Sequence, residues 1–408
     1  MLLLKSATPN LKNNRDKNSM DLNYTAEQTA FRAEVREWLA ANVPAEPLPS
    51  FDTEAGFQAH REWEAKLYEG RWGMITWPES MGGRGADLLQ WLIFEEEYYA
   101  AGAPLRVNQN GIFLLGPTMM EYGTDSQKQR FLTGMATGKD IWCQAWSEPN
   151  AGSDMAAIRS KAELSEDGTH YIVNGQKTWS TRAVWADWAF GMFRTDPDSE
   201  RHKGLSFILV PLDLEGITVR PIPQLDGLPG FAEIFFDNVK VPADCLLGEE
   251  GKGWGVAMAT AGFERGLMLR SPARFQQTAK RLLELYKANQ ATADADPAVK
   301  KAVIKAYMDA EAYTLATYQT ACRLVKGGKI GAESSTNKIF WSELDRDMHA
   351  TAMSILGARA ELLPHAPDAG EVGNWLDGWL FSQSGPIYAG TNEIQRNIIA
   401  ERMLGMPR

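Results

Sequence analysis

The sequence predicts a multidomain α+β protein that has helices toward both ends and a β domain between them. Through residues 26–139, apolar side chains recur every three or four positions, a spacing that gives a helix one buried face. Through residues 142–241 they alternate instead, in short runs separated by glycine and proline. Helical spacing returns after Trp254. We therefore expect an N-terminal helical domain at 20–139, a middle antiparallel β-barrel or sandwich at 140–250 and a C-terminal helical bundle at 251–408.

The N-terminal domain is expected to begin soon after Met20. Thr25 suits the amino-terminal cap of the first helix, because its hydroxyl can accept a hydrogen bond from a free backbone amide. Residues 1–19 are weakly hydrophobic and rich in Lys and Asn, unlike a secretory signal or a transit peptide, so we expect them to be an appendage outside the fold. Helical patterns follow at 31–39, 63–68 and 88–101, with a loop rich in Pro and Gly at 77–85.

Turn signals divide the middle segment into strands. Asp167-Gly168 and Asn174-Gly175 both have the composition of two-residue hairpin turns, which need left-handed backbone. Alternating runs at 205–210 and 233–236 predict further strands. Beyond them, apolar patterns long enough for a helical bundle occupy 275–288, 298–325 and 338–356.

Composition excludes several classes of protein. The chain has 408 residues and a net charge of −10, which argues against nonspecific binding to nucleic acid or to an anionic membrane. No apolar run reaches the roughly 18 residues of a membrane span. The three cysteines, Cys143, Cys245 and Cys322, are far apart and suit a reducing compartment better than a disulfide framework. We therefore expect a cytoplasmic protein.

Common catalytic and cofactor motifs are not matched. The Gly251–Gly255 cluster is too short for the dinucleotide fingerprint and lies in no βαβ pattern. Ser153 lacks the strand-to-helix elbow and the nearby histidine of an acyl-enzyme nucleophile. The five histidines show no metal-ligand spacing, so no metal is expected.

Two stretches of the middle domain have the composition of a binding site. Residues 145–154 read Ala-Trp-Ser-Glu-Pro-Asn-Ala-Gly-Ser-Asp, and residues 174–181 read Asn-Gly-Gln-Lys-Thr-Trp-Ser-Thr. Trp146 and Trp179 offer stacking area, while hydroxyls and backbone amides offer hydrogen bonds. This combination predicts a flat aromatic ligand, although a tryptophan in a barrel core would explain Trp179 equally well.

The same stretches resemble the signature of the acyl-CoA dehydrogenase family of flavoproteins. Its loop Thr/Ser-Glu-Pro-x-Ala-Gly-Ser-Asp and its strand Trp-x-Thr hold the isoalloxazine ring of FAD. The resemblance extends in family order from about Met20 to the carboxyl end. The further segments that carry it are 72–83, Glu95-Glu-Glu97, Phe235–Pro242, Gly248–Gly255 and Tyr388–Arg396.

The resemblance implies FAD as cofactor and an acyl-CoA thioester as substrate. A carboxylate takes the α-proton, the flavin takes a hydride from the β-carbon, and the electrons pass to an electron-transfer flavoprotein. Position by position, Trp146 and Ser147 match the contacts beside the pyrimidine edge, and Trp179, Ser180 and Thr181 match those at the flavin ring. Ser153 matches a serine near the pantetheine, and Thr391 and Glu393 match contacts toward the diphosphate and adenosine.

The catalytic base differs from that of many relatives. Their Tyr-Glu-Gly-Thr sequence reads Tyr388-Ala389-Gly390-Thr391 here, which leaves Ala389 in the substrate site without a carboxylate. A second branch of the family carries the base on a helix, immediately before an arginine, and Gly262-Phe-Glu-Arg-Gly266 matches it. The resemblance thus makes Glu264 the base and Arg265 its orienting, substrate-contacting neighbour. The alternative is a first-turn glutamate favoured by the helix dipole and paired with Arg265.

Further departures from the family's motifs leave the oligomeric state and the identity of the acyl group undetermined. The family's intersubunit FAD motifs are replaced at 286–297 and 354–360, and residues 361–379 form an insertion rich in Pro, Gly and acidic residues. The pattern resembles a bacterial branch that forms homodimers, homotetramers or heterotetramers of paired chains sharing fewer flavins. A base on the helix often accompanies bulky acyl groups in relatives, so we lean toward such a substrate, for example a steroid side chain.

Three interpretations remain. The first is an active FAD-dependent acyl-CoA dehydrogenase. The second is a non-catalytic or FAD-sharing partner subunit, which Ala389 and the altered FAD motifs would allow. The third is a flavin oxidase or monooxygenase on the same fold. The presence of Glu264 and of Gly390-Thr391 favours the first.

Overall fold

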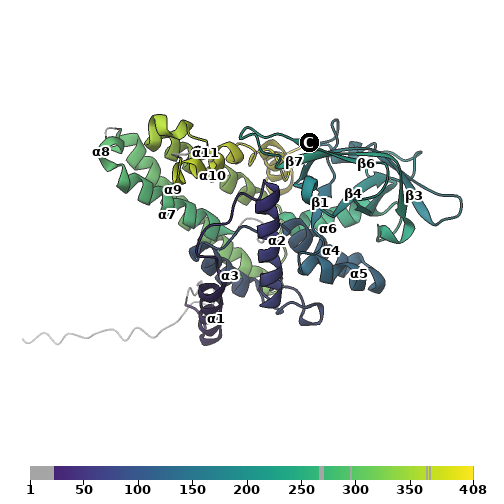
Figure 1. Ribbon diagram of the computed structural model, residues 1–408, viewed down its shortest axis with the longest axis horizontal. Coiled ribbons are helices and arrows are strands. Elements are labelled where there is room, and N and C mark those ends of the chain that lie inside the picture. The colour runs from purple at the N-terminus through teal and green to yellow at the C-terminus, as the bar shows by residue number, and fades with distance from the viewer. Residues whose placement is uncertain (1–22, 266–270, 295, 364–365, 367–368, 408) are drawn as a thin grey trace, which may run out of the picture.

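The computed structural model describes residues 23–265, 271–294, 296–363, 366 and 369–407. Helices, a sheet and a second set of helices follow each other along the chain, which confirms the predicted fold class (Figure 1). In Figure 1 the sheet lies at the right, the long C-terminal helices extend to the left, and the N-terminal helices lie between and below them.

The N-terminal part consists of five α-helices and two shorter helical segments. The helices are α1 (Ala26–Asn42), α2 (Glu54–Glu69), α3 (Leu88–Ala100), α4 (Gly116–Tyr122) and α5 (Asp125–Ala136), with a 3-10 turn η1 (Glu79–Met81) and a π-helical segment η2 (Asn110–Leu115). The predicted cap at Thr25 is confirmed, because its hydroxyl accepts a hydrogen bond from the backbone amide of Gln28 at 3.1 Å.

The middle part is one eight-stranded sheet. Its strands are β1 (Trp142–Ala145), β2 (Lys161–Leu164), β3 (His170–Thr181), β4 (Trp188–Arg194), β5 (Leu205–Pro211), β6 (Ile217–Ile222), β7 (Phe231–Pro242) and β8 (Leu246–Leu247). Seven of them lie in the order β6-β7-β3-β2-β4-β5-β8, and β1 pairs with β4 outside this order. Most pairs are antiparallel as predicted, but β1 and β2 both run parallel to β4, so the sheet is mixed.

One of the two predicted hairpin turns is confirmed and the other is wrong. The chain turns at Asp167-Gly168 between β2 and β3, where Gly168 has φ 70°. Asn174-Gly175 instead lies inside β3, at an irregularity in its pairing with β7. A Cβ on Gly175 would lie 2.3 Å from the Ser160 hydroxyl, so this glycine serves a close approach of two backbones.

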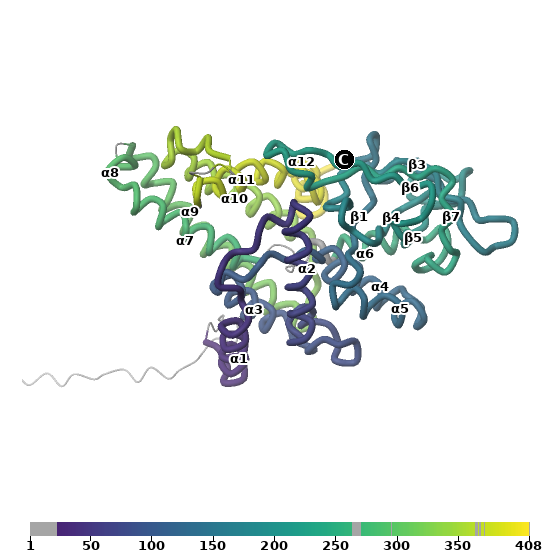
Figure 2. The backbone as a smooth tube through the Cα atoms, in the orientation of Figure 1, coloured from purple at the N-terminus to yellow at the C-terminus, as the bar shows by residue number. Residues whose placement is uncertain are grey.

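The C-terminal part forms the predicted helical bundle. It contains α6 (Gly253–Arg265), α7 (Pro272–Ala288), α8 (Gln290–Ala293), α9 (Pro297–Val325), α10 (Ser334–Leu356), α11 (Glu371–Ser382) and α12 (Asn392–Ile398), with the short segments η7 (Gly357–Glu361) and η8 (Ile399–Met403). The smooth trace in Figure 2 shows α7, α9 and α10 running away from the sheet, whereas α6 lies near the sheet and α4. No helix in the described ranges is long and apolar enough to cross a membrane.

The apolar cores do not follow the order of the chain. A first core joins η2, α4 and α5 to the sheet and to α6, and extends from Met74 to Ala261. Phe131 of α5 shows how it is built, because its ring packs edge-on against Trp142 and Trp188 of the sheet. A second core lies among α7, α9, α10 and α11, and a third joins α1, α2 and α3 to α9. Helices of the N-terminal part therefore pack against both other parts.

Candidate active site

The loop that follows β1 is held against strand β3. Within the loop, Glu148 and Ala151 exchange two backbone hydrogen bonds of 3.0 Å. The backbone amide of Thr178 donates to the carbonyl of Ser147 at 2.9 Å, which joins the loop to β3. The structure thus brings Trp146 and Ser147 beside the strand that carries the other predicted flavin contacts.

A buried ion pair fixes the shape of this loop. The ammonium of Lys177, whose side chain is fully buried, donates to the carboxylate of Glu148 at 2.9 Å and to the carbonyl of Met192 at 2.7 Å. Glu148 also accepts hydrogen bonds from the backbone amides of Arg159 and Ser160 at 2.7 and 2.9 Å. Because both charges are multiply hydrogen-bonded, the pair can persist inside the fold.

The pKa values of both members of this pair are lowered, but for different reasons. Burial lowers the pKa of Lys177 to about 8, although the charge of Glu148 opposes this. Burial alone would raise the pKa of Glu148, but the charge and hydrogen bond of Lys177 bring it below its usual value. Sequence reasoning assigned Lys177 no role. The sequence signal that could have identified it is a lysine at an inward-facing position of an alternating strand, where a buried charge needs a partner.

Strand β3 presents Trp179 to solvent instead of to the sheet's core. The pairing of β3 with β7 shifts register between Lys177 and Ser180, and Trp179 has left-handed backbone with φ 60°. Its indole is 60% exposed and touches Phe231 edge-on at a centroid distance of 6.1 Å. The structure therefore rejects the barrel-core explanation of Trp179. A bulge of this kind re-aims a side chain, and here it offers an open face for stacking.

The other predicted contacts of the loop and strand differ in exposure. Thr181 is half-buried next to Trp179, and Ser180 is buried. Ser153 lies exposed at the far end of the loop, where its neighbour Asp154 forms two hydrogen bonds of 2.8 and 2.9 Å with Arg201. That contact holds the far end of the loop against the segment between β4 and β5.

The C-terminal loop that contains Ala389 is folded back on α12. Ala389 has left-handed backbone with φ 55°, and its carbonyl accepts a hydrogen bond from the side-chain amide of Gln395 at 3.1 Å. The hydroxyl of Thr391 caps α12 by accepting from the amide of Ile394, and Glu393 is exposed. Tyr388 of this loop packs against Trp341 of α10 and Phe381 of α11, and the loop is hydrogen-bonded to Gln395 of α12.

The predicted base lies at the end of α6. The backbone of this helix is described through Arg265, but the side chains of Glu264 and Arg265 lie outside the described part of the structure. Glu264 is the twelfth of the thirteen described residues of α6, far from its first turn, so the first-turn explanation is wrong. A hydrogen bond of 3.0 Å between the hydroxyls of Thr118 and Thr260 fixes α6 against α4.

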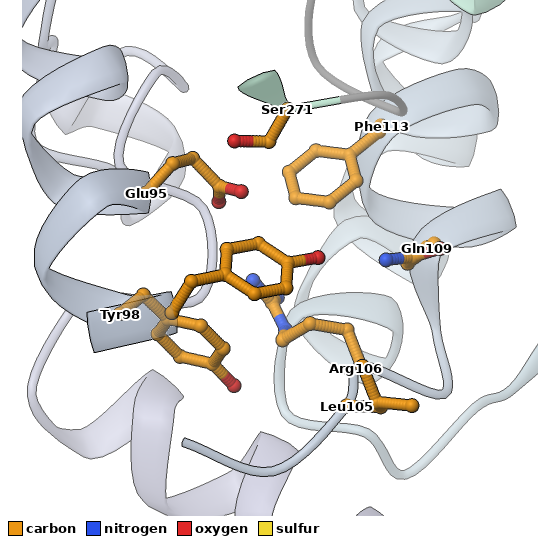
Figure 3. Close-up of a pocket in the computed structure, with 8 residues that line it drawn as sticks. Glu95, Tyr98, Leu105, Arg106, Gln109, Phe113 and Ser271 are labelled. Atoms are coloured by element: carbon orange, nitrogen blue, oxygen red, sulfur yellow. The ribbon is translucent and has the colours of Figure 1, made fainter. Parts of the chain in front are cut away.

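A pocket lies between α3, residues 105–113 and the start of α7. Figure 3 shows the Ser271 hydroxyl, at the start of α7, pointing toward the carboxyl of Glu95 on α3, with the ring of Phe113 beside them. The residues that line the pocket are Glu95, Tyr98, Tyr99, Leu105, Arg106, Gln109, Phe113 and Ser271. Tyr99, which lines this pocket, and Tyr388, the neighbour of Ala389, both lie near Arg274 of α7.

Glu95 is a buried carboxyl in this pocket. Only 8% of Glu95 is exposed, and this burial raises the pKa of its carboxyl to about 7. The charge of Arg106 and a hydrogen bond from Ser271 oppose the increase. Arg106 forms its ion pair with Glu64 instead, at 2.9 Å, and also donates to the carbonyl of Gly73. Sequence reasoning quoted Glu95 only as part of a family motif and missed the pocket.

The raised pKa of Glu95 predicts a specific pH dependence of stability. Between its ordinary value of 4.5 and about 7, the folded chain holds a proton that the unfolded chain releases, so the free energy of unfolding falls as pH rises. We expect Glu95→Gln to remove a pH-dependent loss of about 3 kcal/mol between pH 5 and 8. Urea unfolding of the wild type and the variant at each pH measures the free energy of unfolding. If this free energy varied with pH in the same way in both proteins, the prediction would be wrong.

The residues around the loop after β1 suit a flat ring that forms hydrogen bonds. Among the described side chains, the Trp146 indole nitrogen and the Ser180 hydroxyl are buried without a hydrogen-bond partner, and Trp179 holds its indole open to solvent. Unpaired buried donors are costly unless a ligand or water satisfies them. The open indole of Trp179 beside a hydrogen-bonding loop suits a flat aromatic ring such as that of a flavin. The stacking area predicted for Trp146 is wrong, because its indole packs against Phe190 and Phe207 inside the core.

Comparison with known proteins agrees with this chemistry. Models of the acyl-CoA dehydrogenase N-terminal, middle and C-terminal domains match residues 25–139, 143–239 and 251–404. Acyl-CoA dehydrogenase IpdE1 of Mycolicibacterium smegmatis is 40% identical, covering 93% of this chain and 97% of the relative. Acyl-CoA dehydrogenase FadE26 of Mycobacterium tuberculosis is 32% identical, covering 95% and 99%.

Solved structures give the same result. The Tcur3481-Tcur3483 steroid ACAD is similar with a TM-score of 0.81 and 28% identity, covering 95% of this chain and all of that one. The ChsE4-ChsE5 complex from Mycobacterium tuberculosis is similar with a TM-score of 0.80 and 31% identity over the same shares. Sequence, architecture and site agree over nearly the whole length, and the chain belongs to the acyl-CoA dehydrogenase family.

Proposed function

We propose that this chain is an FAD-dependent acyl-CoA dehydrogenase in which Glu264 is the catalytic base. The observation that carries the proposal is the presentation of Trp179 on a bulge, beside Thr181 and next to a loop fixed by Lys177 and Glu148. A rigid loop and an open indole are what an enzyme needs to hold a flat cofactor at a fixed distance from its substrate.

The chemistry divides between the cofactor and the chain. FAD, when bound, supplies an acceptor for the hydride that leaves the β-carbon of the acyl group. Glu264 takes the α-proton, and Arg265 orients its carboxylate and the thioester. Ala389 leaves space at the position that carries the base in other relatives. Trp146, Ser147, Trp179, Ser180 and Thr181 bind the flavin ring, Ser153 contacts the pantetheine, and Thr391 and Glu393 approach the diphosphate side.

The proposed partners follow from the family and from the similar structures. Electrons pass to an electron-transfer flavoprotein. Two of the similar solved structures, Tcur3481-Tcur3483 and the ChsE4-ChsE5 complex, each combine two differently named chains. This supports a heterotetramer of paired chains as an alternative to a homodimer or homotetramer. One of these similar proteins is a steroid ACAD, which supports a bulky acyl group. The second candidate function is an FAD-sharing partner subunit.

Flavin bleaching distinguishes these functions. The full chain is purified alone and with a co-expressed partner subunit, and its visible flavin absorbance is followed after an acyl-CoA is added without oxygen. Bleaching by the single chain supports a self-sufficient enzyme, whereas bleaching only with the partner supports a shared site. Absence of bleaching in both preparations overturns the proposal, and rapid recolouring in air favours an oxidase.

Replacing Trp179 by alanine tests the flavin contact directly. We expect Trp179→Ala to weaken flavin binding by about tenfold, because the stacked ring loses its indole partner. The free energy of unfolding should change by less than about 0.5 kcal/mol, since the side chain is mostly exposed. The fraction of chain that retains flavin after dialysis is the measurement. Trp179→Phe is the matched control, and equal flavin retention by the alanine variant would contradict the assignment.

A further inference from the structure

The end of strand β3 is held in an unusual backbone conformation. Trp179 and Arg182 both have left-handed backbone, with φ of 60° and 51°, and they enclose Ser180 and Thr181. Residues other than glycine rarely adopt this conformation, and it persists only where the surrounding structure imposes it. The placement of the proposed flavin contacts Trp179 and Thr181 therefore depends on what holds the backbone on either side of them.

Arg182 is held by residues 49–53, which precede α2 and which we call the strap. The guanidinium of Arg182 donates a hydrogen bond of 3.0 Å to the carboxylate of Asp52, and it lies over the ring of Phe51 at 3.9 Å from the centroid. Only 20% of the Arg182 side chain and 15% of the Asp52 side chain are exposed. A guanidinium between a carboxylate and the face of a ring has little freedom to turn, so the strap fixes this side chain.

The strap is itself fixed to helix α2. One ring nitrogen of His60 lies 3.1 Å from the carbonyl oxygen of Pro49, and Phe51 packs edge-on against the same ring at a centroid distance of 5.5 Å. A Cβ on Gly56 would lie 2.0 Å from the carbonyl oxygen of Ser50, so the absence of a side chain lets the strap approach the helix. The N-terminal helical part thus carries the strap as a fixed element.

Apolar contacts already attach the N-terminal part to this region of the middle part. The ring of Phe57 on α2 stacks on Trp185 of η4 (Ala183–Trp185), the 3-10 turn that follows Arg182, at a centroid distance of 5.4 Å. Burial lowers the pKa of Arg182, and the charge of Asp52 opposes this decrease. A buried ion pair contributes little net stability, but it can impose one geometry on the groups around it. A role in orientation therefore accounts for the pair better than a role in attachment.

We propose that Asp52 is a positioning residue of the flavin site, which holds Thr181 and Trp179 in place through Arg182. This inference rests on the proposed function and adds the N-terminal part to the cofactor site. Asp52 and Arg182 act through the backbone of β3 and do not touch the flavin. Their loss should therefore change how tightly and in which orientation the ring binds, while the fold persists.

Three variants test the role of Asp52 in flavin binding. Asp52→Asn keeps the shape and removes the charge, Asp52→Glu keeps the charge, and Glu34→Gln breaks a different ion pair within the N-terminal part, that of Glu34 with Arg84 at 2.8 Å. Apoprotein prepared from each holoenzyme is titrated with FAD. We expect the Kd for FAD to rise about tenfold in Asp52→Asn, and to stay within about threefold of the wild type in Asp52→Glu and Glu34→Gln. The visible circular dichroism of the flavin at saturation should change in Asp52→Asn alone, because it reports the orientation of the ring.

Hydrogen exchange tests the positioning without the cofactor. In the fold, the backbone amide of Arg182 donates to the carbonyl of Gly230 at 3.0 Å, and that of Trp185 donates to the carbonyl of Arg182 at 3.1 Å. In the apoprotein of Asp52→Asn, peptides that cover residues 176–186 should exchange about tenfold faster than in the wild type, because local opening becomes easier. Peptides that cover β5 should exchange at the wild-type rate. Faster exchange in all peptides alike would mean that Asp52 only stabilises the fold, and it would overturn the inference.

The outcomes separate the positioning role from the proposed reaction. If FAD affinity, flavin dichroism and exchange of residues 176–186 are unchanged in Asp52→Asn, the positioning role is wrong and the dehydrogenase stands. If no acyl-CoA bleaches the wild-type flavin but these three properties depend on Asp52, the reaction fails and the positioning role stands. If the wild type binds no FAD with or without a partner subunit, both fail.

Discussion

Glu264→Gln is expected to slow reduction of the bound flavin by an acyl-CoA by at least about 10³-fold. Glutamine has nearly the same shape but cannot accept the α-proton, and a positioned general base contributes about 10² to 10⁴ in rate. The flavin content should remain that of the wild type, because no predicted flavin contact is changed. Stopped-flow measurement of flavin bleaching under anaerobic conditions gives the rate.

A matched carboxylate shows whether the loss is specific to position 264. Glu284 lies exposed on α7 and pairs with its neighbour Lys287, so Glu284→Gln should bleach at the wild-type rate. Near-normal bleaching by Glu264→Gln would remove Glu264 from the mechanism. In that case the base would have to come from another residue or from a partner subunit, since Ala389 has no acidic group.

Lys177→Met should be the most destabilising change in the flavin site. It removes the cation from a buried pair and leaves the carboxylate of Glu148 without its counter-ion, held by the backbone amides of Arg159 and Ser160. Loss of one partner of a buried pair costs about 3–5 kcal/mol, and we expect the free energy of unfolding to fall by that amount. The loop after β1 should also lose its shape, so flavin should dissociate. Denaturant unfolding and flavin absorbance measure the two effects.

Two further variants identify the cause. Lys161→Met removes a lysine that is exposed on β2, and it should leave stability and flavin content unchanged. The double variant Lys177→Met with Glu148→Gln removes both charges and should recover part of the lost stability, because no unpaired buried charge remains. If the single and double variants were equally unstable, the ion pair would not be the reason for the loss.

The order of helices and strands could be predicted because hydrophobic periodicity is a local property. Period 3.6 and period 2 identified the helical, sheet and helical parts, and Thr25 was a cap that needs only the next three residues. The hairpin turn predicted at Asn174-Gly175 was wrong because this position depends on a contact that is not local. Its glycine makes room for Ser160, which directly precedes strand β2, and a local turn signal cannot reveal that contact.

The flavin loop and strand were found from sequence, but the residues that hold and flank them were not. Lys177 and Glu148 are distant in sequence, and only the folded sheet brings them together. Glu95 is the first of three consecutive glutamates, and successive residues of a helix point about 100° apart. Glu95 therefore faces the pocket, while Glu96 and Glu97 form ion pairs with arginines of α1. Three identical residues in a row do not show this difference in the sequence.

The apolar core that joins the helices before residue 139 to the sheet limits how the chain can be divided. A fragment that ends at residue 139 would expose the faces of η2, α4 and α5, and a fragment that begins at 140 would expose the matching side of the sheet. Both pieces should aggregate when produced separately. Produced together, they should reassemble without a peptide bond between them, because packing rather than chain continuity holds that junction closed.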